Sequence, residues 1–60
     1  MSGLTLSDLE QVYDLLADAI DRAPPGRSEL MLTKLALLLA QELGDRPRVE
    51  ALVASALADL

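Results

Sequence analysis

The chain has 60 residues, a formal net charge of −5, and no cysteine or histidine. These absences exclude disulfides, thiolate metal sites and catalysis by a histidine base. A chain this short buries only about 60% of the surface that it exposes when unfolded, so we expect its stability to depend on helix packing and on association.

The composition favours helices packed against helices. Fifteen leucines and nine alanines dominate the hydrophobic content of 52%, whereas phenylalanine and tryptophan are absent and Tyr13 is the only aromatic residue. Leucine and alanine are strong helix formers, and such a composition is typical of helical proteins. We therefore expect one all-helical domain over residues 1–60.

The first predicted helix covers residues 6–23. Two capping signals overlap at its start: Thr5 with Asp8 three residues later, and Ser7 with Glu10. Apolar residues then recur at steps of three and four, so they share one face of the helix. They are Leu9, Val12, Tyr13, Leu16, Ile20 and Ala23.

The opposite side of this helix is acidic. It carries four carboxylates that we call the acidic ridge: Glu10, Asp14, Asp18 and Asp21. We expect an ion pair between Asp18 and Arg22, which lie one turn apart. Charges at helical spacing are typical of a water-facing side, so the sequence predicts a solvated surface here rather than catalytic carboxylates. Leu15 lies on the flank of the apolar face.

Two breaks separate the predicted helices. The Pro-Pro-Gly run at residues 24–26 removes two backbone donors and then supplies a flexible residue, so no helix continues through it. The second break combines Gly44, which suits a left-handed helix end, with the capping residue Asp45 and with Pro47 in a first turn. Both breaks are short, which favours antiparallel neighbours.

The second predicted helix covers residues 28–43 and is apolar on more than one side. Its main apolar arc is wide for a surface helix, and Leu30 and Leu37 fall outside that arc. These two leucines lie two turns apart on a second face, beside Lys34. We expect a helix with two apolar faces to occupy the centre of the fold.

The third predicted helix covers residues 46–59. Its apolar stripe consists of Val49, Leu52, Val53, Ala56, Leu57 and Leu60. An antiparallel arrangement satisfies the apolar faces of all three helices. The sequence therefore predicts an all-α fold, a small antiparallel three-helix unit that is completed by oligomerisation.

Large apolar side chains outnumber the positions that so small a unit encloses. Leucine, isoleucine, valine, tyrosine and Met31 supply 21 such side chains, whereas a three-helix bundle about four turns tall has roughly 12 to 15 inward positions. This surplus predicts a surface that binds a partner. We expect Leu30 and Leu37 at its centre, with Leu15 and Lys34 at its rim.

No pattern in the sequence predicts an enzyme, a cofactor site or a metal site. A nucleophile needs a base beside it, and the sequence has neither a glycine-rich phosphate loop nor the acidic loop of a calcium site. Nucleic-acid binding is disfavoured because ten acidic residues face only five dispersed basic ones.

The sequence predicts a cytoplasmic protein without a membrane anchor. Its first residues lack the basic start and the apolar run of a secretory leader. The longest apolar run, residues 35–40, has six residues, far short of the ~20 that cross a membrane. The absence of cysteine fits a reducing compartment.

Two parts of the chain form a recognisable pattern. An aspartate-rich start precedes Tyr13, and a leucine triplet at residues 37–39 is followed by Ala40, two polar residues, Leu43 and the pair Gly44–Asp45. The pattern resembles that of a bacterial family of helical domains of similar length and unassigned function. The chain departs from that family at two places. It has Gln41–Glu42 where the family has Asn-His, so no role of that histidine carries over, and it has Val12 where the family has an aromatic residue.

The resemblance implies an all-helical bacterial protein. Genes of that family often lie among genes for aromatic-ring breakdown, near flavin-dependent hydroxylases, which implies an accessory subunit. The residues themselves favour a non-enzymatic protein–protein interaction module that associates with itself. The alternative is an accessory or regulatory subunit of a larger enzyme, such as a flavin-dependent aromatic hydroxylase.

Overall fold

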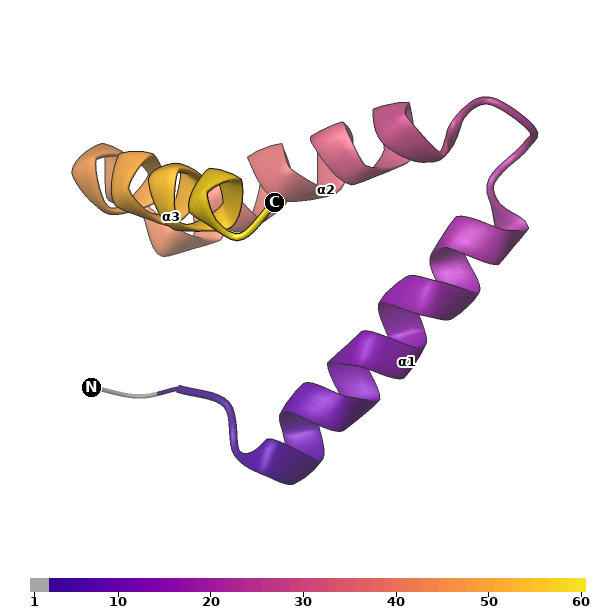
Figure 1. The fold of residues 1–60 in the computed structure, drawn as a ribbon, viewed down its shortest axis with the longest axis horizontal. Coiled ribbons are helices and arrows are strands. Elements are labelled where there is room, and N and C mark those ends of the chain that lie inside the picture. Colours follow the sequence, from indigo (N-terminus) through magenta and orange to yellow (C-terminus); the bar gives the residue numbers. More distant parts are fainter. Residues whose placement is uncertain (1–2) are drawn as a thin grey trace.

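The computed structural model describes residues 3–60 as three helices joined by two short turns (Figure 1). The helices are α1 (Leu6–Arg22), α2 (Ser28–Leu43) and α3 (Arg46–Ala58). No strand occurs in this part of the chain. The all-α prediction is confirmed, and every helix begins and ends within one residue of its predicted range. Among residues 3–60, no helix has the length and the apolar character needed to cross a membrane.

Thr5 caps the start of α1. Its backbone is extended, with φ −64° and ψ 161°, and its side-chain oxygen accepts a hydrogen bond from the backbone N–H of Asp8 at 3.1 Å. Ser7, the competing candidate, lies inside the first turn, where its hydroxyl accepts a hydrogen bond from the side chain of Gln11. Of the two overlapping signals, the structure uses the first, which satisfies one of the unpaired N–H groups of the first turn.

A tight turn over residues 24–27 joins α1 to α2. The backbone N–H of Arg27 donates to the carbonyl oxygen of Pro24 at 2.9 Å. Pro25 occupies the second position of this turn, and Gly26, with a φ of 76°, occupies the third, as in a type II β-turn. Proline fixes its own φ near the value that the second position needs, and glycine readily adopts the positive φ of the third position, so the sequence suits this turn.

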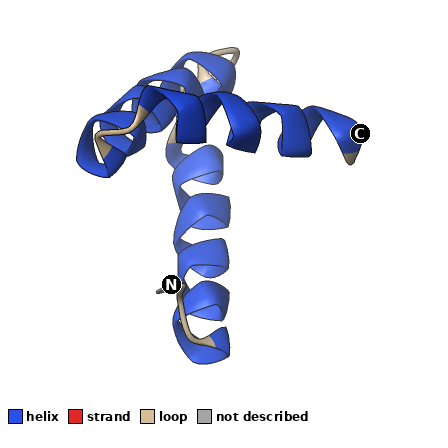
Figure 2. Cartoon of the chain, turned by 90° about the vertical axis from the view of Figure 1, so that its left-hand side faces the viewer, coloured by secondary structure: helices blue, strands red, loops and turns tan. Residues whose placement is uncertain are grey.

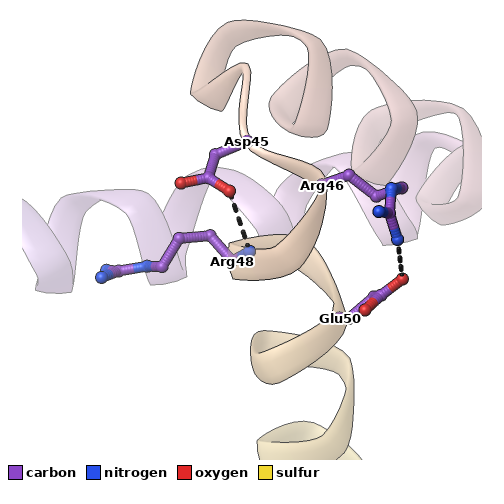
Figure 3. A network of polar contacts seen from close by, with 4 residues as sticks. All are labelled: Asp45, Arg46, Arg48 and Glu50. Carbon is purple, nitrogen blue, oxygen red and sulfur yellow. Dashed lines mark hydrogen bonds and ion pairs between the residues drawn. The ribbon is translucent and has the colours of Figure 1, made fainter.

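Gly44 and Asp45 form the turn between α2 and α3. Gly44 ends α2 in the left-handed region, with a φ of 68°, as predicted for a helix-ending glycine. The carboxylate of Asp45 caps α3 by accepting a hydrogen bond from the backbone N–H of Arg48 at 3.1 Å (Figure 3). Arg46 forms an ion pair with Glu50 one turn further along α3 (Figure 3). The predicted capping role of Asp45 is confirmed.

Replacing Asp45 by alanine is expected to lower the free energy of unfolding by about 1 kcal/mol, because one N–H group at the start of α3 loses its partner. Urea unfolding followed by circular dichroism measures this loss. Asp59→Ala is the matched control: Asp59 lies at the C-terminal end of α3, where a carboxylate interacts unfavourably with the helix dipole. Equal losses in the two variants would contradict the capping role.

The helices do not enclose a core within the single chain. None of residues 3–60 is buried. From their shared turn α1 and α2 diverge, and α3 leads away across the far end of α2 (Figures 1 and 2). No two described residues twelve or more positions apart bring their Cα atoms within 8 Å of each other. The chain thus contains the three predicted helices but does not show the predicted antiparallel unit.

The exposed area measures how far the chain is from compact. Its radius of gyration over Cα atoms is 12.9 Å, against about 10.4 Å for a compact domain of this length. Its accessible surface is 5522 Å², against about 3,800 Å² for a compact protein of this mass. The chain therefore exposes about 1,700 Å² more surface than a compact monomer would.

Candidate interaction surface

The divergence of α1 and α2 leaves a groove of about 690 Å³ between them, which we call the α1–α2 groove. The α1 wall of this groove consists of Leu15, Leu16, Ala19 and Ala23. These residues follow one another at helical spacing and therefore share a face of α1. Because two of them are alanines, another helix can approach the backbone of α1 closely on this side.

The α2 wall of the groove is formed by residues on one face of that helix. It consists of Leu30, Met31, Lys34, Leu35 and Leu38. Met31 and Leu35 are half-buried, whereas Leu30 is 44% and Leu38 is 66% exposed. Leu15 on the facing wall is 66% exposed as well. The groove thus has a half-buried floor and an exposed apolar rim.

The groove is positively charged. Arg27 and Lys34 line it, and no acidic residue does. Neither basic side chain forms an ion pair with another residue in the range 3–60. The two positions are seven residues apart, which corresponds to two helical turns and about 10.5 Å along an α-helix. An acidic helix would therefore find apolar contact and opposite charge in the same groove.

The acidic ridge of α1 is a solvated surface in the single chain. Its only ion pair among residues 3–60 joins Asp18 to Arg22 at 3.1 Å, between side chains that are 59% and 79% exposed. The predicted pair is therefore confirmed, and an exposed pair of this kind contributes only about 0.3–0.5 kcal/mol. Within the described residues, no three acidic side chains gather as a metal ion would require.

The structure brings three of the four predicted partner residues together. Leu15, Leu30 and Lys34 all line the α1–α2 groove. Leu37 lies outside it, lining a smaller hollow of about 340 Å³ beside the turn between α2 and α3. Leu37 is 67% exposed, against 44% for Leu30, so both keep apolar surface in contact with solvent. Their contact with a partner stays a prediction.

Sequence reasoning misses several residues of this groove. Met31, Leu35 and Leu38 belong to the main apolar arc of α2, which the helical periodicity assigns to the core of the chain. The pattern contains no information on where the neighbouring helix diverges, and that divergence opens their face to solvent. Arg27 is one of the dispersed basic residues. Arg27 precedes Lys34 by seven residues, and this spacing could have predicted that the two charges lie on the same side of the helix.

Comparison of the chain with protein-family models, with curated proteins and with solved structures finds no match. The resemblance to a bacterial helical family therefore stays a prediction. The surface of the chain itself offers apolar contact and positive charge along one groove.

Proposed function

We propose that the chain is a non-enzymatic helical interaction module that folds fully only when it associates with further copies of itself. The observation that carries this proposal is the absence of any buried residue in the range 3–60, although 52% of the chain is hydrophobic. Apolar surface in water costs about 25 cal/mol per Å² relative to buried surface. A second copy is present wherever the chain is made, and most soluble oligomers are built from identical copies.

The excess surface has the size of an interface. Each chain exposes about 1,700 Å² more than a compact protein of its mass. Two chains that bury this excess against each other would remove about 3,400 Å² from water, which lies within the range of about 2,000–5,000 Å² for obligate homodimers. The area therefore supports an assembly in which folding and association are coupled.

In the proposed assembly the antiparallel helical unit is completed between chains. The apolar faces of α1 and α2, which have no partner within residues 3–60, would pack against the same faces of a second copy, as in helix bundles. We also propose a cytoplasmic location, which the absence of cysteine supports.

Sedimentation velocity at low micromolar concentration tests the proposed self-association. We expect a species with at least twice the chain mass of 6.4 kDa, together with the circular dichroism of a helical protein. The reason is that the chain lacks an interior until a second copy covers its apolar surface. A folded monomer of 6.4 kDa at this concentration would overturn the proposal.

The open groove favours one alternative, an accessory subunit of a larger enzyme. A groove of about 690 Å³ between two helices suits an amphipathic helix of another protein, and the family resemblance points to a flavin-dependent aromatic hydroxylase. In that case the isolated chain would be a poorly folded monomer. It would form a one-to-one complex with a purified flavin-dependent aromatic hydroxylase from the same cell. Sedimentation of the mixture and of the separate proteins distinguishes this outcome from self-association.

A further inference from the structure

We infer that the α1–α2 groove of one copy receives α1 of a second copy, in a two-fold-symmetric homodimer where each α1 fills the groove of the other chain. This inference rests on the proposed self-association and specifies the surface by which it occurs. Three observations carry it: the charge of the groove, the exposed apolar residues of α1 that lie outside the groove, and the matching spacing of charges on α1 and along the groove.

The charge of the helices selects α1 as the occupant. The groove is lined by Arg27 and Lys34 and by no acidic residue. Within its bounds α1 carries five carboxylates against one basic residue, whereas α3 carries two basic residues against one acidic residue. Complementary charge selects partners and suppresses wrong ones, so the groove attracts α1 of a second copy and disfavours α3.

The apolar face of α1 is wide enough to contact two helices. One part of it, around Leu15 and Leu16, forms the wall of the groove. The other part includes Leu9, Tyr13 and Ile20, which are 53%, 71% and 41% exposed and line neither hollow. When α1 lies in the groove of a second copy, the first part packs against the other α1, and the second part packs against the α2 wall.

The charges also match in spacing. Asp14 and Asp21 are seven residues apart, as are Arg27 and Lys34, and each interval corresponds to two helical turns. None of these four side chains has an ion-pair partner among the described residues. Asp14 follows Tyr13 and Asp21 follows Ile20, so the two carboxylates of the second copy lie beside the apolar contact and can pair with Arg27 and Lys34.

Two charge-reversal variants test this pairing of charges. The groove variant is Arg27→Glu/Lys34→Glu, and the ridge variant is Asp14→Lys/Asp21→Lys. Each variant alone places like charges opposite each other at both grooves of the dimer, so we expect its dissociation constant to rise roughly 100-fold at low ionic strength. When the two are mixed, opposite charges face each other at both grooves. Native mass spectrometry should then show a dimer of one chain of each kind, with helix content restored.

The control variant is Arg46→Glu/Arg48→Glu, which adds as much negative charge as the groove variant. Neither residue lines the α1–α2 groove, so we expect it to dimerise like the unmodified chain. If the unmodified chain dimerises but both charge-reversal variants do so equally well alone and without preference for each other, α1 does not occupy the groove and self-association stands. If the unmodified chain is a folded monomer, the proposed function fails together with this inference.

Discussion

The double variant Leu30→Ala/Leu38→Ala is expected to weaken the proposed oligomer, raising its dissociation constant about a thousandfold above that of the unmodified chain. Both leucines line the α1–α2 groove and keep much of their surface exposed in the single chain. Each truncation removes apolar surface that a partner would cover. The expected loss of association free energy is about 1 kcal/mol per leucine, because the chain itself already covers part of each side chain. A symmetric dimer contains four such sites, so the losses sum to about 4 kcal/mol.

Alanine keeps this test specific for contacts between chains. It is the strongest helix former, so the substitutions favour α2 in the isolated chain, and any loss of structure comes from lost association. Sedimentation equilibrium over a range of concentrations measures the dissociation constant. The control is Leu6→Ala/Leu60→Ala, at two positions that are 72% and 98% exposed and line neither the α1–α2 groove nor the smaller hollow. Equal dissociation constants for the two double variants would contradict a role of the groove in association.

The thermal unfolding midpoint is expected to fall by roughly 10 °C when the chain is diluted 100-fold. Each tenfold dilution lowers the stability of a dimer by about 1.4 kcal/mol. Unfolding 120 residues of dimer changes the entropy by about 0.25 kcal/mol per kelvin, so each tenfold step shifts the midpoint by about 5 °C. Circular dichroism at two chain concentrations measures the shift.

The Asp45→Ala variant provides the control for this experiment. Its lost helix cap lies within one chain, so it should lower the midpoint by a similar amount at every concentration and leave the concentration dependence unchanged. A midpoint that does not change on dilution of the unmodified chain would show that folding is complete within one molecule.

The helix ends were predictable because each is decided by atoms a few residues apart. Thr5 contacts the N–H of Asp8, and Asp45 contacts the N–H of Arg48. The positive φ of Gly44 is likewise a property of one residue and its neighbours in sequence. The sequence carries all the information needed for such contacts, so the predicted and observed bounds agree within one residue.

The surroundings of each helix face were not predictable in the same way. Helical periodicity assigns Leu30 and Leu37 to one face, and the structure places them in different hollows. The two leucines lie two turns apart along α2, one near α1 and the other near α3. Periodicity shows which residues share a face, but it does not show which helix lies next to each of them. In the proposed assembly Leu30 is covered by a second molecule, which no pattern within 60 residues describes.

The absence of contacts between distant residues also sets the speed at which the protein becomes stable. Because no described residues twelve or more positions apart approach within 8 Å, each helix forms by local steps that take about a microsecond or less. Two chains at a concentration of about 1 μM meet only about once per second at a typical rate constant of ~10⁶ M⁻¹s⁻¹. For the proposed dimer, encounter between molecules is then the slow step, so the rate at which dimer accumulates would grow with the square of the concentration of newly made chains.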